Sequence, residues 1–265
     1  MNSSANDLFN STIMDKLLLL IFSSVFLFSS CAEQFNIAGN SSIACLDGRM
    51  LYLRVNPDGN DFEPSESSSS LCLDSCQVVH GRFNFMGEVD SVMLAMLYTG
   101  NQCVMPIVIE NGNLNIQVDN ISQKVSGGPL NDKLYSFFKK RNRFENEIWE
   151  LQQKTICMMR NGCSPEEIQR KVGRKADELS RRSEELEIKF VKDNYNNVLG
   201  PGFFMLLCNK FPTPIITQQI NRILEDAPEL FLNNPFVRNY IQQAHNRIAV
   251  QPQITTTTTI TIDCP

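Results

Sequence analysis

The chain has 265 residues, of which 42% are hydrophobic and 20% are charged, and its formal net charge is −5. This length is enough for one domain of fair size or for two small ones, even if a segment at its start is removed. Because the chain is mildly acidic and has no block of basic residues, nucleic acid is not expected to be a partner.

A nearly unbroken apolar segment lies at residues 17–28. A membrane-spanning helix needs about 20 apolar residues, so this segment has instead the length of the hydrophobic region of a signal peptide. An uncleaved signal anchor or a buried helix is the alternative, but the residues around Cys31 indicate a break. Residues 1–13 contain Asp7 and no basic residue, which does not suit a signal peptide, so we expect Met14 to be the true start.

The end of this segment, Phe28-Ser29-Ser30-Cys31, resembles the lipobox of bacterial lipoproteins, although Leu is usual in place of Phe28. In those proteins the cysteine is acylated and becomes the first residue of the mature chain. The resemblance implies that residues 1–30 are a signal peptide and that lipid on Cys31 attaches the protein to a membrane. One acyl chain holds only weakly, and the several chains of a bacterial lipoprotein imply stable anchoring.

Residues 31–126 are expected to form a lipid-anchored β-rich domain, because apolar and polar residues alternate along short segments between turn signals. The expected strands are 49–55, 72–79, 82–86, 91–98, 103–110 and 114–118. His80-Gly81 is expected to be a tight hairpin turn in which glycine takes a positive φ. The polar stretch 56–70 is expected to be a surface loop. Six or seven short strands predict an antiparallel β-sandwich or open barrel.

Residues 127–250 are expected to be helical, so the predicted fold class is α+β. Two helices, separated at Asn161-Gly162 and with Ser164 as N-cap of the second, are expected to form a long antiparallel hairpin. Their apolar faces comprise Leu134, Phe137, Phe138, Phe144, Ile148 and Leu151 in the first helix, and Ile168, Val172, Ala176, Leu179, Leu186 and Phe190 in the second. Their other faces are densely charged and are expected to be solvated.

The end of the helical region is expected to contain short helices. A break is predicted at Gly200-Pro201-Gly202, followed by helices around 203–210, 215–225 and 236–246. The apolar residues at the start of the first of these are too few to span a bilayer, so they are expected to lie in the core. The Thr-rich residues 251–265 are expected to be a frayed tail or a strand added to the edge of a sheet.

The chain has nine cysteines: Cys31, Cys45, Cys72, Cys76, Cys103, Cys157, Cys163, Cys208 and Cys264. With Cys31 on lipid, eight remain, which permits a disulfide framework in an exported protein. The spacing favours free thiols instead: there is no C-x-x-C, and Cys72 and Cys76, four residues apart in one strand, would be about 13 Å apart. Cys163, beside the predicted cap of the second helix, is the best candidate for a reactive thiol, although a structural role is favoured.

No catalytic, cofactor or metal site is predicted. The only two histidines are His80, in a predicted turn, and His245, on the polar face of the last helix. No serine stands in a G-x-S-x-G setting, as the nucleophile of many hydrolases does. The acidic pairs Glu166-Glu167 and Glu184-Glu185 belong to a charged hairpin, and they do not indicate glycosidic chemistry.

Four phrases, taken in order, resemble one family. They are Asp74-Ser75, Gly81-Arg-Phe-Asn-Phe-Met-Gly87, Ile109-Glu-Asn-Gly-Asn-Leu-Asn-Ile116 and Val125-Ser-Gly-Gly-Pro-Leu-Asn131. They are similar to the DUF4369-type domain of unknown function that precedes a thioredoxin-like domain in lipoproteins of gut-type anaerobic Gram-negative bacteria. The stretch 194–240 is similar to the helical part before that domain, so the resemblance covers about residues 35–245.

The resemblance implies an exported protein on the outer or inner membrane of a Gram-negative bacterium, facing the periplasm or the cell surface. The W-C-x-x-C site of the TlpA- or AhpC-like domain is not found here, so the redox activity is not carried over. One hypothesis is a non-catalytic binding or assembly module that meets a ligand or protein of the cell envelope. The other is a redox accessory whose partner is a separate thioredoxin-like thiol-disulfide oxidoreductase.

Overall fold

The computed structural model describes residues 33–55, 70–120 and 122–250. The predicted signal peptide with Cys31, the predicted loop except for its last residue, and the Thr-rich end lie outside the described residues. No helix in the described part is both long and apolar enough to cross a membrane.

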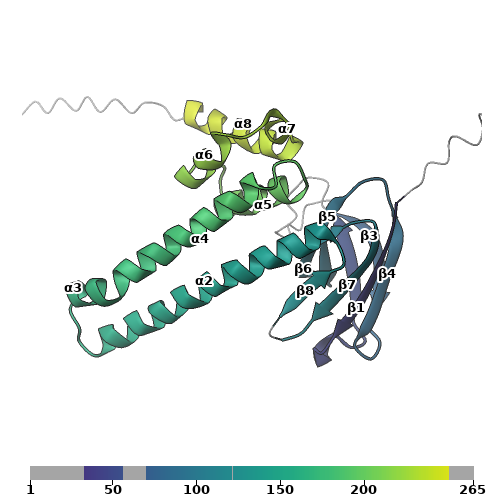
Figure 1. Ribbon diagram of the computed structural model, residues 1–265, viewed down its shortest axis with the longest axis horizontal. Coiled ribbons are helices and arrows are strands. Elements are labelled where there is room, and N and C mark those ends of the chain that lie inside the picture. Colours follow the sequence, from purple (N-terminus) through teal and green to yellow (C-terminus); the bar gives the residue numbers. More distant parts are fainter. Residues whose placement is uncertain (1–32, 56–69, 121, 251–265) are drawn as a thin grey trace, which may run out of the picture. The chain divides into compact units, whose positions relative to one another are not determined.

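The described residues begin with two four-stranded sheets, and the predicted α+β class is confirmed (Figure 1). The strands are β1 (Glu33–Ser41), β2 (Met50–Val55), β3 (Leu71–Gln77), β4 (Arg82–Val89), β5 (Met93–Thr99), β6 (Gln102–Ile109), β7 (Gly112–Val118) and β8 (Gln123–Ser126). Sheet A has the order β4-β1-β7-β8 and sheet B the order β3-β2-β5-β6. A short 3₁₀ turn, η2 (Ala44–Leu46), follows β1. Apolar side chains of both sheets belong to one hydrophobic core.

The strand pairing differs from an all-antiparallel arrangement at one place. β1 and β7 are parallel, with Phe35 opposite Gly112 and Ser41 opposite Val118. Turn signals reveal only hairpins between strands that follow each other, and these two are separated by five other strands in the chain. The parallel pair, and the separate strands β1 and β8, were therefore not among the predicted elements.

The turn between β3 and β4 has the predicted form. His80 and Gly81 both have positive φ, 51° and 71°, as a two-residue type I′ hairpin turn requires. Val79 and Arg82 pair across it. After this turn Phe83 and Phe85 point into the core, and the absence of a side chain at Gly39 leaves the space that the Phe83 ring occupies.

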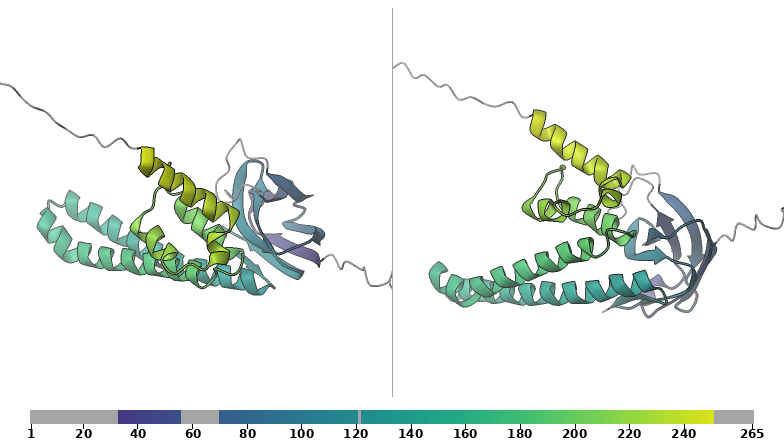
Figure 2. Two further views of the ribbon diagram at one scale, coloured as in Figure 1. Left: turned by 90° about the horizontal axis from the view of Figure 1, so that it is seen from above. Right: turned by 45° about the horizontal axis from the view of Figure 1, so that its top comes forward.

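The second half of the chain is helical and contains the predicted hairpin. Its elements are α2 (Pro129–Arg160), α3 (Pro165–Ile168), a π-helical turn η3 (Gln169–Gly173), α4 (Arg174–Lys192), α5 (Leu199–Cys208), α6 (Gln218–Leu224), α7 (Glu229–Leu232) and α8 (Pro235–Val250). α2 and α4 lie side by side over much of their length (Figure 2). The Ser164 side chain accepts a hydrogen bond from the Glu167 N–H, which confirms the predicted N-cap.

The predicted break at residues 200–202 was wrong in position. The chain leaves the helix earlier, at residues 193–198, and Gly200, Pro201 and Gly202 lie in the first turn of α5. A proline is tolerated there because the first N–H groups of a helix have no partner within it. Gly200 lies against the backbone of Asn194, where a side chain would not fit.

Aromatic side chains hold the base of the hairpin to α5. Phe137 of α2 stacks on Phe190 of α4 with ring centroids 4.0 Å apart, and Phe203 of α5 meets both rings edge to face. The apolar start of α5 is buried, as predicted. The hairpin therefore packs against the helices that follow it through side chains that the periodicity had placed on inner faces.

Candidate functional site

Two of the four family-like phrases meet where the β-domain joins α2. The Glu110 carboxylate, just after β6, accepts hydrogen bonds from the N–H groups of Leu130 and Asn131, 3.1 and 3.0 Å away. It thereby caps the N-terminus of α2, where N–H groups lack partners and the helix dipole favours negative charge. Gly128 lies so close to this carboxylate that a side chain there would collide with it.

Asn131 covers the outer edge of β6. Its amide accepts from the Val108 N–H at 3.0 Å and donates to the Val108 carbonyl at 2.7 Å and to Glu110 at 2.9 Å. One helical turn on, the Tyr135 hydroxyl donates to the carbonyl of Pro106. An edge strand otherwise presents such groups unpaired. These residues are therefore architectural.

A second set of polar residues lies on the outward face of sheet A and has no such role. Phe35, Ile37, Phe83, Leu114 and Ile116 point into the core, so the alternate positions of β1, β4 and β7 point to solvent. Seven of these outward positions carry an exposed carboxamide: Gln34, Asn36 and Asn40 on β1, Asn84 on β4, and Asn113, Asn115 and Gln117 on β7. We call this surface the carboxamide face.

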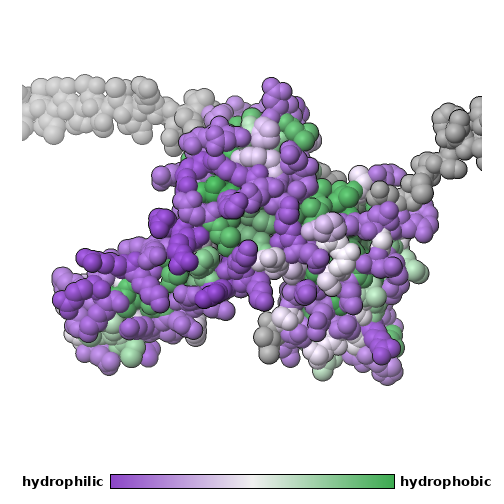
Figure 3. Space-filling view, in the orientation of Figure 1, coloured by the Kyte–Doolittle hydropathy of each residue, from purple (hydrophilic) through white to green (hydrophobic). Residues whose placement is uncertain are grey.

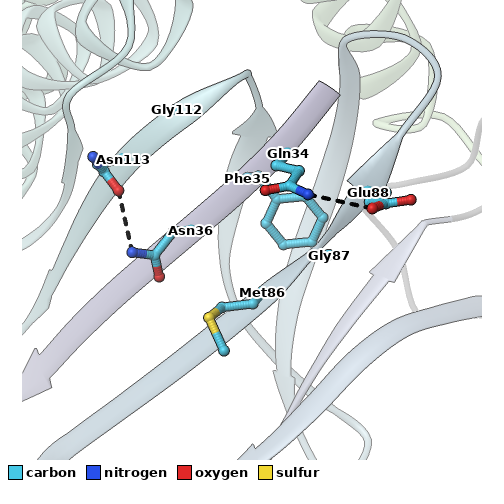
Figure 4. Close-up of a pocket in the computed structure, with 8 residues that line it drawn as sticks. All are labelled: Gln34, Phe35, Asn36, Met86, Gly87, Glu88, Gly112 and Asn113. Carbon is cyan, nitrogen blue, oxygen red and sulfur yellow. Dashed lines mark hydrogen bonds between the residues drawn. The ribbon is translucent and has the colours of Figure 1, made fainter. Parts of the chain in front are cut away.

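A pocket of about 480 Å³ opens at one end of the carboxamide face (Figure 4). Gln34, Asn36, Met86, Glu88 and Asn113 surround it, and Phe35, Gly87 and Gly112 complete its lining. The Phe35 ring occupies the space that the missing side chain of Gly87 leaves, and a side chain on Gly112 would meet no atom within 4 Å.

The polar groups of this pocket are only partly used. Asn36 Nδ2 donates to Asn113 Oδ1 at 3.1 Å, and Gln34 Nε2 donates to Glu88 Oε1 at 3.3 Å (Figure 4). Each carboxamide has two donor hydrogens and two acceptor lone pairs. Most of this capacity therefore faces solvent, and the pocket offers both donors and acceptors with one carboxylate beside them.

A larger pocket, of about 720 Å³, lies between α5, α8 and the segment that follows α5. Its lining includes Phe211, Phe236, Arg238 and Tyr240. The Tyr240 hydroxyl is already engaged by the N–H and the carbonyl of Ile215, at 3.0 and 2.9 Å. Burial raises the pKa of Tyr240 to about 12. This hydroxyl therefore fastens the segment after α5 to α8.

The seven cysteines in the described part are free thiols, and Cys72 and Cys76 lie on one strand as predicted. Burial raises the pKa of Cys103 to about 11 and that of Cys208 to about 12, and it also raises the pKa of Cys76. A thiolate, which is the reactive form, is therefore disfavoured at these three positions.

The predicted reactive thiol, Cys163, is half-buried between α2 and α3. Its neighbour Glu167 has a pKa lowered mainly by Lys171, with which it forms an ion pair, and to a smaller degree by a hydrogen bond from Cys163. The thiol thus lies beside one carboxylate and one ammonium group. Its reactivity, and the redox-accessory hypothesis with it, stays a prediction.

The two histidines lie apart, His80 in its turn and His245 on the exposed face of α8. Within the residues that the structure describes, no three His, Cys, Asp or Glu side chains gather as a metal ion would need. Sequence reasoning did not identify the carboxamide face. The signal was present in the alternation Gln34-Phe-Asn36-Ile, which was not among the predicted strands, and in the similar run on β7, which served only to predict a strand.

Comparison with known proteins gives one match. No curated protein and no solved structure is significantly similar to the chain. A family model described as a domain of unknown function, DUF4369, matches residues 35–134. The matched segment contains both sheets and the first turns of α2, including the Glu110–Asn131 junction. Residues 35–134 are therefore a DUF4369 domain.

Proposed function

We propose that this protein is an exported lipoprotein, anchored through lipid on Cys31 to the outer or inner membrane of a Gram-negative bacterium, and that it acts as a non-catalytic binding module. The sequence Phe28-Ser29-Ser30-Cys31 after a short apolar segment supports the anchor. The carboxamide face supports the binding function, and it is the single observation on which that function rests.

The composition of this face is unusual for a sheet. Asparagine is depleted from strands, and an outward position on a half-exposed sheet places few demands on its side chain. Yet β1, β4 and β7 together present seven Asn or Gln side chains on one surface. Where a sequence departs from local preference without a structural gain, a functional site is the usual reason.

The chemistry of the face indicates its ligand. A carboxamide donates and accepts hydrogen bonds without carrying a charge, which matches hydroxyl groups that do the same. The pocket of about 480 Å³ between Asn36, Met86 and Asn113 is of the size that holds a small ligand or one unit of a chain. We therefore expect a neutral, hydroxyl-rich ligand, such as a glycan chain lying along β1 and β7.

The anchor is tested by replacing Cys31 with Ser and separating membranes from soluble protein. The wild type should fractionate with membranes and carry acyl groups on Cys31, whereas Cys31→Ser should carry none. A wild-type chain that carries no acyl group on Cys31 would show that the lipoprotein assignment is wrong.

The binding function is tested by electrophoresis through gels that contain neutral polysaccharides. Retardation should weaken about tenfold in apparent affinity in Asn36→Ala and Asn113→Ala, because each replacement removes about 1.4 kcal/mol of hydrogen bonding at the ligand. Gln152→Ala, an exposed carboxamide on α2, is the matched control and should migrate as the wild type does. A wild type that no neutral polysaccharide retards would overturn the proposal.

A further inference from the structure

The far end of the helical hairpin differs in charge from the rest of the chain. Residues 154–175, which we call the hairpin end, comprise the last turns of α2, then α3, η3 and the start of α4. They contain six basic and two acidic residues, a net charge of +4 in a chain whose total is −5. The six basic side chains are Lys154, Arg160, Arg170, Lys171, Arg174 and Lys175, and all are exposed.

Five of these cations form no ion pair among the described residues; the exception is Lys171, 2.6 Å from Glu167, a carboxylate that Arg170 also affects electrostatically. Elsewhere on the hairpin several basic side chains form ion pairs one turn apart, as Arg143 does with Glu147 and Lys189 with Asp193. A group of unpaired cations on one surface attracts an anionic partner.

Exposed apolar side chains lie on α2 at the hairpin end and next to it. Trp149, Ile156 and Met159 are 60%, 43% and 62% exposed. Their spacing of seven and three residues places them on one side of the helix, over a length of about 15 Å. Figure 3 shows hydrophobic residues among hydrophilic ones along the hairpin. Trp149 is the only tryptophan of the chain.

We propose that the hairpin end docks onto the surface of an anionic lipid bilayer, with the cations at the headgroups and the stripe of Trp149, Ile156 and Met159 at the acyl boundary. Helical segments that lie in this interface combine lysine and arginine with exposed aromatic and aliphatic residues, and tryptophan favours this depth. A nucleic acid offers no apolar layer to cover the stripe. A bilayer offers anionic headgroups for the cations and an apolar layer for the stripe. The docking is independent of the lipid on Cys31.

Trp149 makes the test direct, because no other residue of the full chain contributes indole fluorescence. The purified protein is mixed with vesicles of phosphatidylcholine alone, or with about a third phosphatidylglycerol, each containing lipid brominated in its acyl chains. We expect Trp149 emission to shift to shorter wavelength and to be quenched only by the anionic vesicles, and the effect to fall as salt is raised.

Charge reversal identifies the surface. Each cation near an anionic bilayer strengthens binding about fivefold, so Arg170→Glu with Arg174→Glu should weaken it at least about 25-fold. Lys139→Glu with Lys140→Glu, exposed and nearer the start of α2, is the matched control and should bind as the wild type does.

Three outcomes would overturn the proposal. They are equal Trp149 emission in neutral and anionic vesicles, equal losses in the two double variants, and a response to a soluble acidic polypeptide but not to vesicles, which would identify a protein partner instead. Vesicle binding by a chain without acyl groups on Cys31 would support the docking even if the lipoprotein assignment failed.

Discussion

The β-domain and the helical region each bury one glutamate, and they compensate its charge differently. Glu110 receives only N–H groups, from Leu130, Asn131 and the Asn131 amide. Glu187 of α4 meets Arg141 at 3.1 Å, Lys210 at 3.3 Å and Gln219 at 2.8 Å. The cations at Glu187 retain partial contact with water, whereas the donors at Glu110 belong to a buried helix terminus.

The difference shows two ways of joining parts of one chain. At Glu110 the geometry is fixed by backbone groups, so the joint tolerates little change and is insensitive to salt. At Glu187 long side chains converge from α2, α4, α6 and the segment after α5, and such a joint can adjust when one partner is lost. The DUF4369 match covers the first joint and not the second.

The largest effect is expected from Asn131→Leu. The change leaves the N–H and carbonyl of Val108 unpaired and removes a donor from Glu110, and each buried unpaired group costs about 1–3 kcal/mol. We expect the free energy of unfolding, measured with urea, to fall by about 3–5 kcal/mol. Asn115→Leu, at an exposed position, is the control, and an equal loss there would contradict the role assigned to Asn131.

A smaller effect is expected from Gly39→Ala in the β-domain. The new methyl group would collide with the Phe83 ring, a clash that should cost about 1–3 kcal/mol. Gly173→Ala in the hairpin is the paired change, since its methyl group would meet only the flexible end of Gln169. That variant should be neutral or stabilised by up to about 1 kcal/mol, because alanine favours a helix. Equal urea midpoints for the two variants would remove this contrast.

The sequence predicted the elements whose signals lie close together in the chain, and it missed contacts between distant segments. Alternation of apolar residues located six strands, and the caps around Ser164 located the hairpin, because these signals lie within a few residues of one another. The parallel pairing of β1 with β7 joins segments far apart in sequence, so no local signal could reveal it. The first turn of α5 was missed because Gly200-Pro201-Gly202 also suits a break.

The candidate sites, too, depend on contacts between distant parts of the chain. The carboxamide face requires knowing that β4, β1 and β7 are neighbours in one sheet, which their sequences do not state. The charged hairpin was interpreted as a solvated face, and pairing explains much of it. Which cations stay unpaired, as Arg174 and Lys175 do, becomes evident only when each side chain has been placed.

The contrast between the two joints is sharpened by replacing each glutamate with glutamine. Glu187→Gln loses two ion pairs whose cations are partly exposed, so a cost of about 1–2 kcal/mol is expected, shrinking as salt is added. Glu110→Gln loses hydrogen bonds to backbone groups, and its cost should not change with salt. Urea unfolding at low and high salt measures both. Equal salt dependence in the two variants would show that the joints do not differ in kind.

The last effect is expected at alkaline pH, and it again separates the regions. Burial raises the pKa of Cys208, in the helical region, from 9.0 to about 12, and that of Cys103, in the β-domain, from 9.0 to about 11. Between these values the folded protein keeps a proton that the unfolded chain releases. The free energy of unfolding therefore falls as pH rises, by up to about 1.4 kcal/mol per pH unit for each thiol.

Replacing each thiol in turn shows how much of the fall in the free energy of unfolding comes from each region. Between pH 9 and 10 the free energy of unfolding should fall less in Cys208→Ala than in the wild type. Cys103→Ala should show the same reduction, but it should end at a lower pH, because the pKa of the folded Cys103 thiol is lower. The slope of the unfolding free energy against pH is the quantity to compare, since each variant also loses packing. A slope unchanged by Cys208→Ala would mean that its thiol ionises in the folded protein as readily as in the unfolded chain. Water would then reach the thiol at the end of α5 in the helical region, whereas it is excluded from the core between the two sheets.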